Sequence, residues 1–153
     1  MAAAETEVSP FPFHAARRSF TGSSLDDERI AIRYLRAGEG ELSAEASFGP
    51  RSAGAPGIVH GGAVLTVLDE AMGAACWVRG LRVLTARLSA AFRRGVPVGR
   101  SYRVETVFEP SRGRLFRVTG RLIDSSGVVY ADAEGSFVRL TESQFRARFS
   151  TES

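Results

Sequence analysis

Apolar side chains alternate with polar or small ones along residues 30–34 and again along residues 42–48. A period of two is typical of β-strands with one buried face. Gly38 and Gly40 lie between the two runs and mark a turn. The sequence therefore predicts a two-stranded hairpin here. The segment GPRSAGAPG that follows is dense in glycine and proline, and we expect it to be a loop.

The next segment, HGGAVLTVLDEAMGAACWV at residues 60–78, predicts one helix. Apolar residues cover most of its circumference and few charges interrupt them, so this helix is expected to be surrounded by protein. Four further runs predict strands, at residues 82–92, 102–108, 115–123 and 128–138. The tail ESQFRARF predicts a short amphipathic helix. Helix and strands are segregated, which favours the α+β class, with an antiparallel sheet of five to six strands curled around one central helix.

The chain has 153 residues, of which 44% are hydrophobic and 24% are charged, and this is typical of one soluble domain. We expect a loose N-terminal arm over residues 1–25, the main domain over residues 26–141, and a short C-terminal helix or tail over residues 142–153. No apolar run approaches the roughly 20 residues that cross a bilayer, so no membrane span is expected. The first residues lack a basic start and a long apolar run, so no secretory signal is expected either.

All 20 basic residues are arginines, but the formal net charge is only +3. The arginines are scattered along the chain and form no single stripe, so we do not expect nucleic acid as a partner. Cys76 is the only cysteine, and the two histidines are His14 and His60. An intramolecular disulfide and a multi-histidine metal cage are therefore impossible, and no metal or cofactor is expected. A reducing, cytoplasmic setting fits these features.

The start of the helix and one acidic residue in its middle carry the candidate chemistry. Gly61 and Gly62 open the helix, where glycine costs stability and the first amides have no intrahelical partner. Such amides suit the negative charge of a developing oxyanion; a sterically tight helix entry is the alternative. Asp69 lies among apolar neighbours in the middle of the helix, which favours a functional role; a solvated face of the helix is the alternative. Glu70 points about 100° away and is expected to be structural or to lie at the rim.

Gly61 and Asp69 are eight residues apart, or about 12 Å along one helix. A reacting carbon has to lie about 3 Å from both groups. If both groups act on one substrate, they therefore come from two copies whose helices run antiparallel across a twofold axis. The catalytic hypothesis requires a homodimer.

The segment GAPGIVHGGAVLTVLDEAMGAAC resembles the signature of hotdog-fold acyl-CoA thioesterases, in the group of the phenylacetate-pathway thioesterase and thioesterase superfamily members four and five. The order of strands and helix from Arg29 to Leu140 is similar to that fold. The resemblance implies that the chain hydrolyses an acyl-CoA to a free acid and CoA, as a homodimer or a dimer of dimers. One departure is Gly54, where several relatives have Asn or Gln, so an amide that would help hold the carbonyl is missing.

The resemblance also implies roles for individual residues. Asp69 would be the nucleophile or the general base for water. The backbone amide of Gly61 would polarise the thioester carbonyl, with His60 ordering that corner. Thr85 aligns with a hydroxyl residue that orients water or the carboxylate; an ordinary strand threonine is the alternative. Contacts with the substrate are implied for Gly62, Phe92, Arg112, Gly113 and Arg114.

Two other functions remain open. A hotdog dehydratase or hydratase would need a histidine upstream of the helix to remove an α-proton, and residues 15–59 contain none. A non-catalytic acyl-CoA binding module would use the same groove with a silent Asp69, and nothing in the sequence excludes it. The length and type of acyl group accepted are expected to depend on the depth of a pocket set by Met72, Trp77 and the N-terminal arm.

Overall fold

The computed structural model describes residues 3–12, 20–22 and 28–149. The elements in chain order are β1 (Glu5–Val8), β2 (Ile30–Ala37), β3 (Leu42–Phe48), the 3-10 turn η1 (Pro50–Ser52), α1 (Gly61–Trp77), β4 (Val83–Phe92), β5 (Ser101–Glu109), β6 (Leu115–Ile123), β7 (Val129–Arg139) and α2 (Glu142–Phe149). The predicted hairpin, the central helix and the four later strands are confirmed. Their ends agree to within one residue, except that β2 continues three residues beyond the predicted run. The α+β class is also confirmed.

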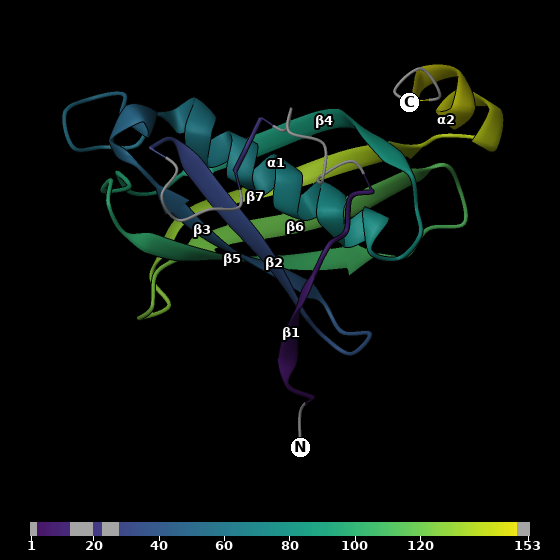
Figure 1. Cartoon of the computed structure of the whole chain (residues 1–153), viewed down its shortest axis with the longest axis horizontal. Helices are drawn as coiled ribbons and strands as arrows, with labels where there is room; N and C mark the ends of the chain where they lie inside the picture. Colours follow the sequence, from purple (N-terminus) through teal and green to yellow (C-terminus); the bar gives the residue numbers. More distant parts are fainter. Residues whose placement is uncertain (1–2, 13–19, 23–27, 150–153) are drawn as a thin grey trace.

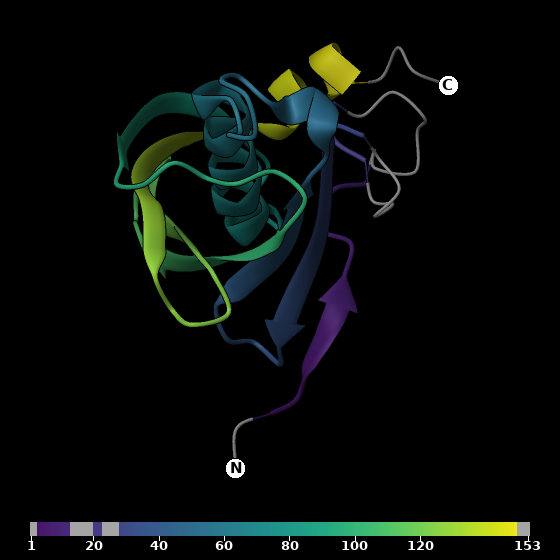
Figure 2. The same cartoon turned by 90° about the vertical axis from the view of Figure 1, so that its left-hand side faces the viewer.

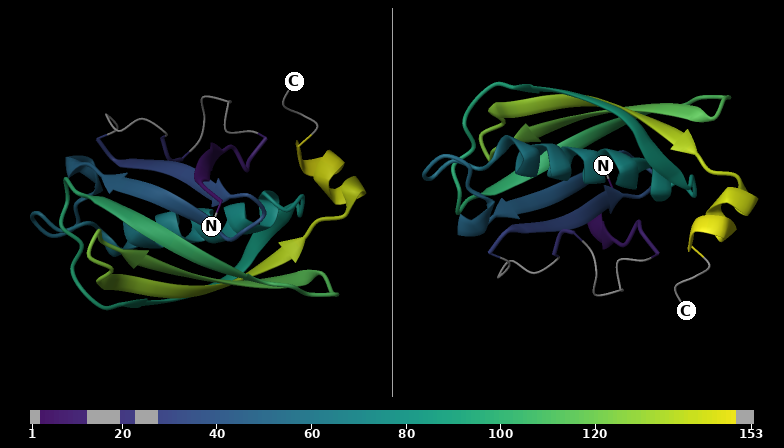
Figure 3. Two further views of the ribbon diagram at one scale, coloured as in Figure 1. Left: turned by 90° about the horizontal axis from the view of Figure 1, so that it is seen from below. Right: turned by 90° about the horizontal axis from the view of Figure 1, so that it is seen from above.

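The strands form one antiparallel sheet in the order β1-β2-β3-β5-β6-β7-β4. This is seven strands rather than the expected five to six. The sheet curls around α1, as the end-on view shows (Figure 2), and α1 packs against every strand from β2 to β7. In the views from above and below, α1 runs lengthwise inside the curve (Figure 3). The predicted arrangement of a sheet around one buried helix is therefore correct.

Glycines on the inner face of the sheet make room for α1. A Cβ atom at Gly120 of β6 would lie 3.1 Å from Met72 Cγ, and one at Gly135 of β7 would lie 2.5 Å from Phe137 Cε2. Met72 and Phe137 are both almost fully buried, so larger residues at these glycines would force core side chains to move. Met72, which we expected to help set the acyl specificity, consequently lies in the core of the protomer.

The additional strand comes from the N-terminal segment that we expected to be a loose arm. β1 pairs with the last four residues of β2 and extends away from the main body (Figure 1). Arg103 of β5 donates hydrogen bonds to the carboxylate of Glu5 in β1. Nearer the start of β2, Gly22 forms a parallel bridge with Ala31. The N-terminal segment thus covers this edge of the sheet at two places.

The opposite edge of the sheet is β4, and no described residue pairs with its outer side. α2 lies beyond the start of this strand (Figure 1) and buries none of its residues fully. It is held by aromatic contacts, since the Phe145 ring lies 6.1 Å from that of Trp77 and the Arg82 guanidinium stacks on it at 4.2 Å. Within the described residues, no helix has both the length and the apolar character needed to cross a membrane.

Candidate active site

His60 satisfies most of the amides at the start of α1. Its carbonyl oxygen accepts hydrogen bonds from the amides of Ala63 and Val64, at 2.9 and 3.2 Å, and its Nδ1 accepts one from the amide of Gly62 at 2.9 Å. No hydrogen bond from the amide of Gly61 is recorded among the described residues. With respect to the described residues, the Gly61 N–H is therefore a free donor at the positive end of the helix.

Two glycines fix the imidazole of His60. A Cβ atom at Gly62 would lie 3.0 Å from Nδ1, and one at Gly54 would lie 3.3 Å from Cδ2 and 3.1 Å from Cα of His60. The departure at Gly54 therefore has a physical reason, because the ring and backbone of His60 occupy the space that a side chain would need. Since a backbone amide can only donate, Nδ1 is unprotonated and the ring proton resides on Nε2. The amide of Gly62 is engaged by His60, so it is not a free donor for a substrate.

Asp69, on the third turn of α1, faces the start of β4. Its Oδ1 accepts a hydrogen bond of 2.8 Å from the hydroxyl of Thr85. The pairing of β4 with β7 shifts register directly after Thr85, and such bulges re-aim the side chains beside them. The structure thus brings together two of the residues singled out from the sequence.

The pKa of Asp69 is raised above its ordinary value, mainly because the carboxyl group is partly buried. The hydrogen bond from Thr85 lowers it, and the nearby charge of Glu70 raises it further. No arginine forms an ion pair with Asp69 in the part of the chain that the structure describes. Asp69 is therefore a stronger base than an exposed aspartate.

Glu70 turns away from Asp69 toward β2. Its Oε2 accepts hydrogen bonds from Tyr34 Oη at 2.9 Å and from Thr21 Oγ1 at 2.7 Å. Tyr34 and Thr21 are only 4% and 3% exposed. Glu70 therefore ties α1 to β2 and to the N-terminal segment, in agreement with the structural role expected for it.

A pocket of about 290 Å³ opens beside the start of α1 and is lined by Val59, Gly61, Val64 and residues 92–96. The ring of Phe92 is 55% exposed, and a Cβ atom at Gly61 would lie 3.8 Å from it. Arg93 pairs with Asp132 at 2.8 Å, whereas no ion pair of Arg94 is recorded among the described residues. Sequence reasoning did not single out Arg94, although a basic pair directly after a strand was a signal that could have identified it.

The turn with Arg112, Gly113 and Arg114 lies elsewhere in the protomer. Arg114 donates to the carbonyl oxygen of Arg139 at 3.2 Å, and Arg139 pairs with Val83 at the start of β4. Phe92 ends the same strand, about 30 Å further along at the usual rise per residue. Within one protomer the structure therefore brings Phe92 to Gly61 but leaves this turn at the other end of the sheet.

Gly61 and Asp69 both lie on α1, so about 12 Å of helix separates them. One protomer cannot place the free amide and the carboxylate on the same carbon atom. No cluster of three or more His, Cys, Asp or Glu side chains that could hold a metal ion occurs among the described residues.

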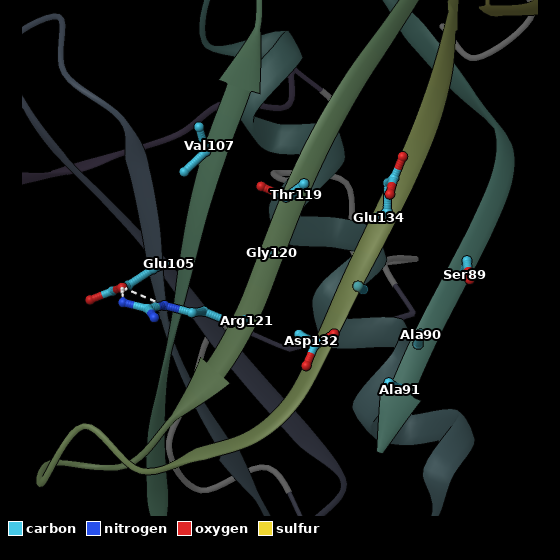
Figure 4. Close-up of a pocket in the computed structure, with 11 residues that line it drawn as sticks. Ser89, Ala90, Ala91, Glu105, Val107, Thr119, Gly120, Arg121, Asp132 and Glu134 are labelled. Carbon is cyan, nitrogen blue, oxygen red and sulfur yellow. Dashed lines mark hydrogen bonds and ion pairs between the residues drawn. The ribbon is translucent and has the colours of Figure 1, made fainter. Parts of the chain in front are cut away.

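A second pocket, of about 460 Å³, lies on the face of the sheet away from α1 (Figure 4). Its charged groups are largely neutralised by one another and by neighbours. Arg121 donates to Glu105 at 2.7 Å, Asp132 pairs with Arg93, and Glu134 pairs with Arg117. This pocket contains none of the site residues expected from the sequence.

The family model of the thioesterase superfamily matches residues 56–131. Acyl-coenzyme A thioesterase THEM4 of Bos taurus is 33% identical over 94 residues, which are 60% of this chain and 38% of that protein. The protein of the same name from Xenopus laevis is 25% identical over 128 residues, which are 81% of this chain and 57% of that protein. The chain thus spans between about two fifths and three fifths of these curated relatives.

A solved structure with a similar fold is that of a hypothetical thioesterase from Streptococcus pneumoniae with coenzyme A. It has a TM-score of 0.66 and 14% identity, and the match covers 71% of this chain and 85% of that one. The E. coli PaaI protein from the phenylacetic acid degradation operon gives a TM-score of 0.67 and 16% identity, over 72% of this chain and 80% of that one. Both likenesses concern the fold.

A sheet curled around a single helix, with a glycine-rich helix start, defines a hotdog-fold protein. The motif that carries the candidate site falls inside the matched residues 56–131, and the chain belongs to the thioesterase superfamily.

Proposed function

We propose that this chain is an acyl-CoA thioesterase whose active sites form between two copies of the chain. Each site would combine Asp69 of one subunit with the backbone amide of Gly61 of the partner subunit. One observation carries the proposal: α1 presents both a helix-start amide with no recorded partner among the described residues and a partly buried carboxylate. The two groups are too far apart to act together within one protomer.

In the proposed reaction, Asp69 takes a proton from a water molecule and the water oxygen bonds to the thioester carbon. The carbonyl oxygen becomes negative and is stabilised by the N–H of Gly61. The carbon–sulfur bond then breaks, CoA leaves as a thiolate, and the proton held by Asp69 returns to solvent or to the thiolate. Direct attack by Asp69 on the carbon remains the alternative, with water then hydrolysing the mixed anhydride. In both routes, Thr85 orients the carboxylate.

The open edge of the sheet supports the dimer. β4 has ten residues and no described partner along its outer side, and an unpaired edge of that length favours pairing with another strand. Antiparallel pairing of two β4 strands would place two α1 helices side by side and antiparallel. It would also bring the turn at residues 112–114 of one subunit toward Phe92 and Gly61 of the partner subunit. A dimer of dimers is compatible with this arrangement but is not required by it.

Coenzyme A is the proposed carrier of the acyl group for two reasons. The curated relatives are named acyl-coenzyme A thioesterases, and the similarly folded streptococcal protein was crystallised with coenzyme A. In addition, the pocket beside Gly61 contains Arg94, and a guanidinium group suits the phosphates of CoA.

A thiol-release assay with a panel of acyl-CoA esters tests the proposal. Replacing Asp69 by Asn should lower kcat by about 10²–10⁴-fold, the usual contribution of a general base. Glu39→Gln, an exposed carboxylate in the turn between β2 and β3, is the control and should leave kcat unchanged. Equal rates for Asp69→Asn and the parent would reject Asp69. Tight CoA binding without turnover by the parent would instead favour the acyl-CoA binding module.

A further inference from the structure

α1 carries two consecutive carboxylates, and neither has an ion-pair partner among the described residues. This is notable in a chain with 20 arginines. Hydroxyl groups replace cations here. Thr85 donates to Asp69 at 2.8 Å, while Tyr34 and Thr21 donate to Glu70 at 2.9 and 2.7 Å. Hydroxyls satisfy carboxylate oxygens without cancelling their charge.

The two hydroxyls on Glu70 converge on one oxygen atom, Oε2, from segments far apart in the sequence. Tyr34 belongs to β2, where it pairs with Ala44 of β3. Thr21 precedes Gly22, which exchanges hydrogen bonds with Ile30 and Ile32 at 3.0 and 2.9 Å. Both donors are thus anchored in the sheet. They hold Glu70 and with it the rotation of α1, so that Asp69, about 100° around the helix, meets Thr85.

A neutral glutamine could accept both of these hydrogen bonds through its carbonyl oxygen. What glutamate adds is a negative charge next to Asp69. A like charge disfavours ionisation of its neighbour, and the charge of Glu70 does raise the pKa of Asp69.

The other groups that face these carboxylates do not counter this effect. Tyr34 is neutral, and its own pKa is raised by burial first and then by the charges of Glu70 and Asp69. β4 contributes the hydroxyl of Thr85, and its exposed Arg87 forms no ion pair with Asp69 among the described residues. Within the described part of the chain, the charge of Glu70 therefore acts on Asp69 with no ion-paired cation to offset it.

We propose that Glu70 is a positioning residue of the active site, pinned by Tyr34 and Thr21, that fixes the face of α1 presenting Asp69 and keeps a second negative charge beside it. This rests on the proposed function, and it couples the N-terminal segment at Thr21 to the reacting carboxylate. Glu70 itself does not touch the substrate.

A titration of the free protein tests the charge. The carboxyl carbon of Asp69 is followed by ¹³C NMR against pH, and its signal is assigned by its loss in Asp69→Asn. In Glu70→Gln, which keeps both hydrogen bonds, the pKa of Asp69 should move down. In the control Glu142→Gln, which removes a carboxylate on α2, the pKa of Asp69 should be the same as in the parent. An unchanged titration in Glu70→Gln overturns the proposal, and this result does not depend on any enzymatic activity.

Kinetics test the consequence. The acidic limb of kcat/KM for acyl-CoA hydrolysis should move to lower pH in Glu70→Gln with KM unchanged. Tyr34→Phe keeps the charge but removes one anchor, so it should lower kcat without moving the limb to lower pH. Identical profiles for the parent and both variants would overturn the positioning role. Absence of turnover by the parent would instead contradict the proposed function, while the NMR titration would still decide the role of Glu70.

Discussion

Two inactive variants combined in one dimer would test whether Asp69 and Gly61 act across a subunit boundary. Asp69→Asn removes the carboxylate and keeps the amide. Gly61→Val keeps the carboxylate and places a side chain where the carbonyl oxygen of the substrate has to lie. The first atom of that side chain fits, because a Cβ atom at Gly61 would lie 3.8 Å from Phe92, an ordinary contact. Each homodimer should be folded and inactive.

The expected recovery follows from the geometry of α1. The 12 Å between Gly61 and Asp69, against the roughly 3 Å that the chemistry allows, requires every site to draw on both subunits. A hybrid dimer then contains one intact site, made by Asp69 of the Gly61→Val subunit and Gly61 of the Asp69→Asn subunit, and one site with both changes. Its kcat per dimer should be about half that of the parent, with the same KM. An unselected equal mixture should show about one quarter, because half of its dimers are hybrids.

The assay is thiol release from an acyl-CoA by hybrids that were co-expressed with two different tags and purified on both. Light scattering should establish that they are dimers, and thermal unfolding that both variants are folded. Hybrids that carry both tags but are no more active than either homodimer would refute the reasoning, since sites within single subunits cannot be rescued by mixing.

Further changes probe the acid, the core and the helix cap. The pKa of Asp69 is raised in the folded state, so ionisation of this carboxyl group costs stability as the pH rises from its ordinary pKa through the raised one. Asp69→Asn should therefore melt at a higher temperature than the parent at pH 7 but not at pH 3. A lower melting temperature of the variant at pH 7 would contradict this. Gly135→Ala would press on the buried ring of Phe137 and should lower the free energy of unfolding in urea by about 1–3 kcal/mol. Gly113→Ala, whose new Cβ atom would be 3.7 Å from its nearest neighbour, should lower it far less. Equal losses for the two variants would argue against the close packing at Gly135. His60→Ala removes the side-chain cap of α1 and should lower the free energy of unfolding by about 1 kcal/mol. His60→Asn can still cap the helix and should recover most of this loss. The unfolding curves of the two variants would coincide if the cap were irrelevant.

The local sequence determined the elements of this fold. Alternation with a period of two predicts β2 and β3, four further runs separated by turns predict the later strands, and the apolar surface of residues 60–78 predicts α1. These patterns reflect backbone geometry over a few residues. For the same reason, Gly61 at a helix start, Asp69 in the helix middle and the distance between them follow from the sequence alone. The family match at residues 56–131 agrees with the motif that carried the resemblance.

Only the tertiary structure decided which distant residues meet. It placed β4 beside β7 at the open edge of the sheet, set Thr85 against Asp69, and anchored Glu70 to Tyr34 and Thr21. It also showed that part of the expected loose arm forms β1 and that the imidazole of His60 packs against Gly54. The turn at residues 112–114 lies far from Phe92 in the protomer. These contacts depend on strand order and on the space between packed side chains, and neither leaves a periodic signal in the chain.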